Sequence, residues 1–156
     1  GIIKRDLRKY PIVITPFLKD IDNLHNAGAD IIAFDATLRN RPFAINEMIE
    51  RIHFHNKIAM ADCSTTKEGI NALENQADII STTLSGYTSS KKPSKFPDFV
   101  LLKKLIEKSK LPIFAEGRFD TPQLFKKAIS MGSHSVVVGT ALNRIEIITN
   151  RFINES

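Results

Sequence analysis

Cysteine and tryptophan are nearly absent from this chain of 156 residues, which has one cysteine and no tryptophan. A single cysteine excludes an internal disulfide framework and suits a reducing, cytoplasmic setting. No apolar run approaches the roughly 18 residues of a membrane span, and no signal-peptide pattern opens the chain. No Gly-x-Gly-x-x-Gly follows an apolar run, which argues against a dinucleotide-binding sheet. We therefore expect a cytoplasmic protein with no membrane partner.

The composition is that of one ordinary globular domain spanning residues 1–156, with 42% hydrophobic and 25% charged residues. A net charge of +5 suits anionic partners, including nucleic acid. However, the lysines and arginines are spread along the chain, and the aromatic residues are not interleaved with arginine as a base-stacking surface requires. The sequence therefore gives little support to nucleic-acid binding.

Short apolar runs recur along the chain without the alternation of half-exposed strands, which predicts strands covered on both faces. They are Ile2-Ile3, Ile31–Phe34, Ile58–Ala61, Ile79–Leu84, Ile113–Ala115 and Val136–Val138. A seventh, weaker run at Ile12–Ile14 is predicted to lie in a long loop.

Amphipathic segments separate these runs. Residues 43–55 place Ala44, Met48, Ile49 and Ile52 on one helical stripe. Capping residues mark further helix starts, namely Thr65 with Glu68, Asp98, and Thr121 before Pro122. Gly28, Gln76 and Gly132 each stand where a helix is predicted to end and the chain turns into a strand.

Alternating helices and strands predict a parallel α/β sheet of six βα units. A (β/α)8 TIM barrel needs two more units and roughly 200 residues. Six strands are enough for an open doubly wound sheet, which is the alternative architecture. The chain starts without methionine, inside an apolar run at Gly1. We therefore expect an incomplete barrel whose first two units lie upstream of this sequence.

Polar residues follow each apolar run, and the carboxyl ends of parallel strands are where such folds place their sites. These groups are Lys4-Arg5-Asp6, Asp35-Ala-Thr37, Asp62-Cys-Ser64, Thr82-Thr83, Glu116-Gly-Arg118 and Gly139-Thr140. Aspartate, serine and threonine there also cap helices, so some of them are structural. Lysine and glutamate are not capping residues at a helix start, which favours a chemical role for Lys4 and Glu116.

The last two runs carry glycines suited to phosphate, because loops after the final strands of such barrels bind phosphate through backbone N–H groups. Gly117 and Gly139 follow these runs, and Glu116 places a carboxylate beside the first. Arg144, just beyond, is either a further phosphate contact or a plain surface residue. The site would then hold a phosphorylated small molecule next to a proton-transfer group.

Other reactive side chains have simpler explanations. His53 and His55 lie two apart on a predicted helix and face different directions, so they make a poor metal pair. Cys63 has no histidine obviously placed to activate it and is expected to be a small buried thiol. No metal site is predicted.

In these residues the chain resembles N-acetylmannosamine-6-phosphate 2-epimerases, which are ribulose-phosphate-binding barrels. The resemblance covers the whole chain in one order. The matching stretches are Gly1–Asp6, Asp35–Pro42, Met60–Thr65, Thr82–Thr88, Pro97–Phe99, Ala115–Arg118 and Val136–Gly139.

The resemblance implies a (β/α)8 barrel that interconverts N-acetylmannosamine 6-phosphate and N-acetylglucosamine 6-phosphate by moving the C2 proton, with no cofactor or metal. Lys4 then matches the catalytic lysine and Glu116 its acidic partner. Substrate-binding positions are Asp62, Arg5, Thr83 and Tyr87, and phosphate-binding positions are Gly117, Arg118, Gly139, Thr140 and Arg144. A homodimer is the assembly to test.

Two departures from the family pattern matter. The family's first two βα units, which carry an active-site Gln and Arg, have no counterpart in this sequence. Asn143-Arg144-Ile145 stands where the family usually reads Thr-Arg-Pro. Two alternatives stay open: another phosphate-binding barrel acting on a pentose or heterocycle phosphate, and a non-catalytic remnant.

Overall fold

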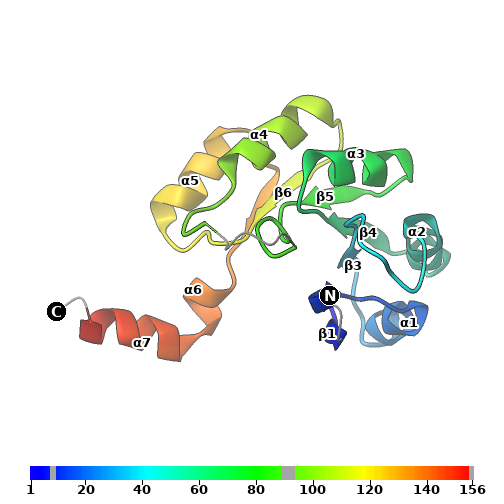
Figure 1. Cartoon of the computed structure of the whole chain (residues 1–156), viewed down its shortest axis with the longest axis horizontal. Helices are drawn as coiled ribbons and strands as arrows, with labels where there is room; N and C mark the ends of the chain where they lie inside the picture. Colours follow the sequence, from blue (N-terminus) through cyan, green and yellow to red (C-terminus); the bar gives the residue numbers. More distant parts are fainter. Residues whose placement is uncertain (8–9, 89–93, 155–156) are drawn as a thin grey trace.

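Five parallel strands form the main sheet of the computed structural model, which describes residues 1–7, 10–88 and 94–154 (Figure 1). The strands lie side by side in chain order. They are β3 (Ile31–Asp35), β4 (Ile58–Asp62), β5 (Ile79–Ser81), β6 (Ile113–Glu116) and β7 (Ser135–Val137). Asp35 of β3 stands opposite Asp62 of β4, and Glu116 of β6 opposite Val137 of β7. The carboxyl ends therefore meet at one edge, as predicted.

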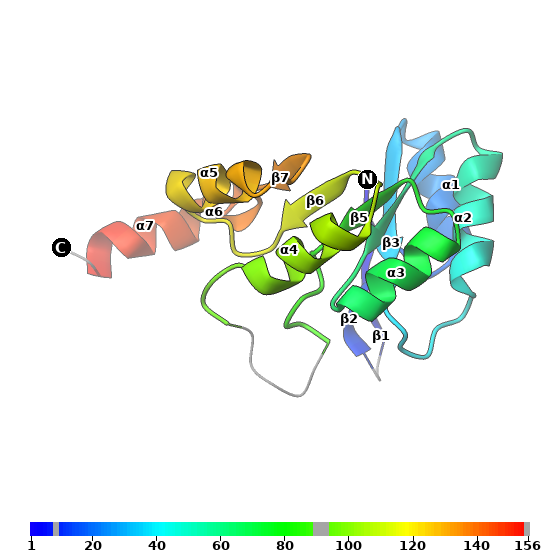
Figure 2. The ribbon, with the colours of Figure 1, turned by 90° about the horizontal axis from the view of Figure 1, so that it is seen from above.

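Helices alternate with the strands and cover the outer face of the sheet (Figures 1 and 2). These covering helices are α1 (Leu18–Asn26), α2 (Ile45–Phe54), α3 (Thr66–Glu74), α4 (Phe99–Lys108) and α5 (Pro122–Ser130). Two further helices, α6 (Thr140–Asn143) and α7 (Ile145–Asn154), follow the last strand. Among the described residues, no helix is long and apolar enough to cross a membrane.

The first sixteen residues differ from the prediction. Strand β1 (Lys4–Leu7) pairs antiparallel with β2 (Tyr10–Ile14), so the main sheet has five parallel strands and not six. The prediction of a strand at Ile2-Ile3 is wrong, although the carbonyl of Gly1 accepts from the Ala33 amide at 3.0 Å beside β3. Placing Ile12–Ile14 in a loop is also wrong, because these residues pair with β1.

Helix starts follow the capping residues that the sequence marks. The side chains of Thr65, Asp98 and Thr121 accept hydrogen bonds from the amides three residues onward. Ala44 differs from its prediction: it is the exposed N-cap of α2, whose buried stripe begins at Ile45. A carboxylate oxygen of Glu47 accepts from the Ala44 amide at 2.6 Å, which completes that cap.

The predicted helix-to-strand junctions all use left-handed backbone. Gly28 and Gly132 have φ of 84° and 101°, and Gln76 takes the same conformation at 67°. Glycine adopts this region without a steric penalty, whereas Gln76 does so at some conformational cost. The three turns therefore repeat in geometry as well as in sequence.

The main core lies between the sheet and the covering helices. Ile32, Phe34 and Ile80 from the strands and Leu102 and Leu105 from α4 are at most 1% exposed. Each such side chain stabilises the fold by roughly 1.5–3 kcal/mol. This core fixes β3 to β6 and hence the positions of the residues at their carboxyl ends.

The C-terminal end is packed differently. All three residues of β7 are half-buried, so the prediction that this strand is covered on both faces is wrong. Figures 1 and 2 show α7 standing away from the rest of the molecule. Leu142 and Ile145 are 69% and 74% exposed there. Apolar side chains at this end of the chain are therefore not buried merely because they are apolar.

Candidate active site

A cavity of about 620 Å³ opens at the carboxyl ends of β5, β6 and β7. It gathers most of the residues that the sequence marked for chemistry, from four separate stretches of chain. Its lining includes Lys4, Thr83, Tyr87, Glu116, Gly117, Arg118, Gly139, Thr140 and Arg144. Arg5 and Asp62 are the two predicted residues outside this lining.

Glu116 is the last residue of β6, and a threonine of the neighbouring strand end holds its backbone. The hydroxyl of Thr82 donates to the Glu116 carbonyl at 2.8 Å, and the Glu116 amide donates to that hydroxyl at 3.0 Å. Burial raises the pKa of Glu116, while hydrogen bonds from Thr83 and Ser81 and the charge of Lys4 oppose this shift. The carboxyl is thus positioned at the cavity with an increased preference for its protonated form.

Asp62 lies behind the cavity wall at the end of β4 and is only 1% exposed. Its Oδ1 accepts from the Thr83 hydroxyl at 2.9 Å. Burial, followed by the nearby charge of Glu116, raises the pKa of Asp62 well above its ordinary value, and Lys4 opposes the shift. Asp62 and Glu116 therefore form one electrostatic group with Lys4, although Thr83 separates Asp62 from the cavity.

The two glycine-bearing loops both reach the cavity, but their backbones differ. Gly117 has φ of 98° and Arg118 follows at 64°, so two consecutive residues are left-handed. Gly139 precedes the short helix α6 with φ of −99°, and a Cβ there would meet open space. Glycine is therefore needed for backbone conformation at 117, whereas nothing in the backbone or packing requires it at 139.

Arg118 holds a neighbouring loop as well as lining the cavity. Its Nε donates to the Phe96 carbonyl and its Nη1 to the Ser85 carbonyl, both at 2.9 Å. The guanidinium also lies 5.5 Å from the centre of the Tyr87 ring, within cation–π range. The predicted phosphate contact through its side chain would thus use the remaining donors.

Arg5 and Arg144 take up other contacts. Arg5 forms an ion pair with the buried carboxylate of Asp20 in α1 and lies over the Phe17 ring. This side chain thus braces the hairpin against α1 and does not line the cavity. Arg144 lines the cavity while pairing with Glu146 at the start of α7.

Asp35 at the end of β3 belongs to a separate network. Its carboxylate accepts from the Thr37 amide at 2.9 Å and hydroxyl at 2.6 Å, and it pairs with Arg39 and Arg41. Glu68, which is 7% exposed, accepts from the Leu38 and Ser64 amides and so joins the loops after β3 and β4. The predicted Thr65–Glu68 capping box is therefore only half right, because Glu68 caps other amides.

Two residues of the site escaped the sequence analysis. Ser81, which is fully buried, places its hydroxyl 2.6 Å from that of Thr83. Its signal was the two-residue spacing to Thr83, which puts both hydroxyls on one side of an extended chain. Lys95 lines the cavity from an exposed position, and nothing in its sequence context indicated this.

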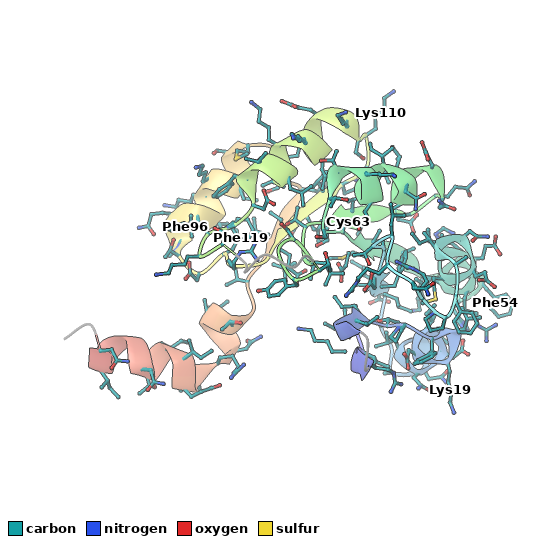
Figure 3. All side chains as sticks on the ribbon, viewed as in Figure 1. Lys19, Phe54, Cys63, Phe96, Lys110 and Phe119 are labelled. Atoms are coloured by element: carbon teal, nitrogen blue, oxygen red, sulfur yellow. The ribbon has the colours of Figure 1, made fainter. Side chains whose placement is uncertain are left out.

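The remaining reactive side chains match their simpler explanations. Figure 3 shows Cys63 in the interior, and it is a free, buried thiol whose pKa burial raises well above the ordinary value. His53 contacts Asp78 at 2.8 Å and His55 contacts Asp22 at 2.7 Å, so the two face different partners. Within residues 1–7, 10–88 and 94–154, no group of His, Cys, Asp and Glu is arranged to hold a metal ion.

Comparison with known proteins gives a match along the whole chain. The model of the family described as "Putative N-acetylmannosamine-6-phosphate epimerase" matches residues 1–156. A Salmonella typhimurium protein with the corresponding 2-epimerase name is 48% identical over 152 residues, which are 97% of this chain and 66% of that protein. A Haemophilus influenzae protein of that name is 47% identical and is covered to 67%. The chain thus spans about two thirds of the length of these relatives.

Solved structures agree with the fold. The N-acetylmannosamine-6-phosphate 2-epimerase from Clostridium perfringens superposes with a TM-score of 0.93 at 43% identity, covering 100% of this chain and 69% of that one. Thiamine phosphate pyrophosphorylase from Pyrococcus furiosus, at 20% identity and a TM-score of 0.59, shares the fold over 78% of this chain and 55% of its own. The predicted TIM-barrel class is confirmed, with this chain forming part of a barrel.

Proposed function

Because this chain belongs to the N-acetylmannosamine-6-phosphate epimerase family, we propose that it carries the proton-transfer and phosphate-binding parts of a sugar-phosphate 2-epimerase. The substrates are N-acetylmannosamine 6-phosphate and N-acetylglucosamine 6-phosphate. One observation supports this above all: Lys4 and Glu116 line the same cavity as the loops at Gly117 and Gly139. Proton-transfer groups and a phosphate anchor thus share one space.

The chemistry proceeds through the open-chain sugar. With C1 as an aldehyde, loss of the C2 proton leaves an electron pair that delocalises onto the carbonyl oxygen. Returning a proton to the opposite face of C2 completes the inversion, so groups on both faces are needed. Lys4 and Glu116 supply them, and the elevated pKa of Glu116 favours the protonated carboxyl that can donate.

The phosphate acts as an anchor away from the reacting carbon. Backbone N–H groups around Gly117 and at the start of α6 hold it, and Arg118 and Arg144 add positive charge. Binding energy from this remote group keeps C2 within reach of Lys4 and Glu116. Thr83 and Tyr87 border the sugar between the two ends, and Asp62 supports Thr83 from behind through their 2.9 Å hydrogen bond.

Proton NMR in D2O tests this proposal. We expect N-acetylmannosamine 6-phosphate incubated with the chain to exchange its C2 proton for deuterium while the gluco epimer accumulates. The Clostridium perfringens enzyme is the positive control, and a Lys4→Met variant of this chain is the negative control. Unchanged C2 proton signals with this chain, while the control enzyme reacts, would contradict the proposal for the 156 residues.

A further inference from the structure

Thr15 has a backbone conformation that its own side chain and the next residue both disfavour. Its φ is 46°, in the left-handed region that a β-branched residue rarely adopts. It also precedes Pro16, and a residue before proline prefers extended backbone. Thr15 is nevertheless 0% exposed, directly after β2 where the chain turns towards α1. Such a conformation persists only where the surrounding structure holds it.

Two hydrogen bonds join Thr15 to Ile3 across the hairpin. The Thr15 amide donates to the Ile3 carbonyl at 2.7 Å, and the Ile3 amide donates to Thr15 Oγ1 at 3.2 Å. In a regular antiparallel ladder, two facing residues of a hydrogen-bonded pair exchange two amide–carbonyl bonds. At this pair the threonine hydroxyl takes the place of one carbonyl. The Thr15 side chain therefore fixes the backbone of Ile3 from the opposite strand.

This clamp acts on the residue directly before Lys4. In the hairpin register Lys4 faces Ile14, and both residues line the cavity. Lys4 is exposed and its side chain is a flexible four-carbon stem, so its backbone decides where the ammonium group can reach. The segment before Lys4 is held at two points, because the Gly1 carbonyl also accepts from the Ala33 amide of β3 at 3.0 Å.

The residue after Lys4 is held from the same turn, but by its side chain. Arg5 Nε donates to Asp20 Oδ2 at 2.9 Å, and Asp20 Oδ2 also accepts from the Phe17 amide at 3.3 Å. The Arg5 side chain is 42% exposed, whereas Thr15 is fully buried. Of these two anchors, Thr15 therefore constrains the backbone that carries Lys4 more directly.

We propose that Thr15 is a positioning residue, whose hydroxyl fixes the backbone at Ile3 so that the Lys4 side chain lies in the cavity beside Glu116. The proposal rests on the proposed epimerase function, in which Lys4 is one of the two proton-transfer groups. Thr15 lies outside the cavity lining and acts through Lys4. This role accounts for a threonine at a backbone conformation that glycine would adopt without a steric penalty, because glycine has no hydroxyl.

Thr15→Gly separates the hydroxyl from the turn. Glycine keeps the left-handed backbone, whereas the bond from the Ile3 amide to the side chain is lost. We expect kcat for N-acetylmannosamine 6-phosphate, per folded molecule, to fall at least about tenfold while KM stays within about twofold. The reason is that Lys4 is misplaced while the phosphate anchor is intact. Thr15→Ser keeps a hydroxyl and should keep most of the wild-type kcat.

Thr65→Gly is the matched control. It is the same substitution and removes another threonine hydroxyl that accepts from an amide, that of Glu68 at 3.3 Å, at the start of α3. Its kcat per folded molecule should equal that of the wild type. A loss as large as in Thr15→Gly would mean that any such bond matters equally, and the proposal would be overturned. Wild-type kcat in Thr15→Gly, or equal losses in Thr15→Ser and Thr15→Gly, would overturn it as well.

A titration of Glu116 reports the position of Lys4 without any turnover. Burial raises the pKa of Glu116, and the nearby charge of Lys4 is one of the effects that oppose this rise. Moving or removing that positive charge should therefore raise the pKa further. Carboxyl-carbon NMR of the labelled protein should show the rise in Lys4→Met and, to a smaller extent, in Thr15→Gly. Thr15→Ser and Thr65→Gly should titrate as the wild type does.

An unchanged titration of Glu116 in Thr15→Gly would show that Lys4 has not moved, and the proposal would be overturned. The same follows if Lys4→Met leaves the pKa of Glu116 unchanged, because Lys4 then does not lie beside it. If the wild-type chain does not turn over but the pKa of Glu116 rises in Thr15→Gly, the positioning role is supported and the failure lies in the proposed function.

Discussion

Two aspartates at the carboxyl ends of neighbouring strands have opposite surroundings. Asp35 and Asp62 stand in register on β3 and β4, and they are 6% and 1% exposed. Asp35 is paired with Arg39 and Arg41, whose positive charges compensate its own. Asp62 bonds to the Thr83 hydroxyl and lies near Glu116, so its pKa rises.

The contrast shows how one residue type at equivalent positions serves two purposes. A buried carboxylate that is held by arginines braces the loops around it through charge-assisted hydrogen bonds. A buried carboxyl bonded to hydroxyls has access to both protonation states. The β3 end therefore serves as scaffold, and the β4–β6 ends are where our proposal places proton transfer.

Glu116→Gln should have the largest effect. The amide keeps the shape of the side chain but neither accepts nor returns a proton, so inversion at C2 should fall by about 10²–10⁴-fold. Substrate affinity, measured by calorimetry, should change little because the phosphate anchor remains. Asp35→Asn is the matched comparison: it should lower stability while leaving the rate per folded molecule close to wild type. A larger rate loss in Asp35→Asn than in Glu116→Gln would reverse the assignment of the two regions.

Arg41→Met should have the next largest effect, which is a loss of stability. The methionine fills part of the buried space but leaves Asp35 with one arginine fewer, which costs about 1.5–3 kcal/mol in free energy of unfolding. Urea denaturation followed by circular dichroism measures this change. Asp35→Asn combined with Arg41→Met should cost less than the sum of the single changes. Additive costs would mean that the two side chains are not coupled.

Asp62→Asn should change how stability depends on pH. Burial raises the pKa of Asp62 above its ordinary 3.8, so the folded chain binds this proton more tightly than the unfolded chain does. Stability is therefore lost as the pH rises from that ordinary value towards the raised one. The asparagine variant lacks this loss, about 1.4 kcal/mol for every tenfold change in the acid dissociation constant, and should be relatively more stable at neutral pH. Urea titrations from acid to neutral pH test this, and parallel curves for both proteins would contradict it.

Glu68→Gln should have the smallest effect, although it acts where the two regions meet. Glu68 accepts from the Leu38 amide at 3.1 Å and the Ser64 amide at 2.9 Å, joining the loop after β3 to the loop after β4. The amide side chain offers one acceptor in place of two, which costs about 1 kcal/mol. A thermal unfolding scan measures the loss, and Glu74→Gln, on the last turn of the same helix, provides the control. Identical losses in the two variants would exclude the bridging role.

The sequence predicted the central fold well because its signals there are local. Short apolar runs placed β3 to β6, and caps such as Thr121 placed the helix starts. The hairpin was missed because pairing of Lys4 with Ile14 depends on contacts between segments, which no single run of residues displays. Burial of β7 was overestimated for a related reason: Val136 is apolar, but its exposure depends on what packs beside it.

The sequence predicted the location of the site but not the hydrogen bonds and ion pairs within it. Polar residues after strands indicated the right edge, and the cavity brings Lys4 and Glu116 together there. The partner of Arg5 could not be read from the sequence, because Asp20 approaches from a helix fifteen positions away. Ser81 was hidden inside an apolar run, and only the structure shows its hydroxyl 2.6 Å from that of Thr83.

The single cysteine can serve as a labelling probe of how often this site opens. Cys63 follows Asp62 directly, is fully buried, and its amide donates to the Ser81 carbonyl at 2.9 Å. A thiol reagent therefore reacts only when β4 separates from its surroundings, and the labelling rate reports how often that happens. Because the chain has no second cysteine, the signal is unambiguous without any mutation. A substrate that holds the strand ends together would lower the labelling rate of Cys63. Substrate binding could therefore be followed from this rate without detecting any product.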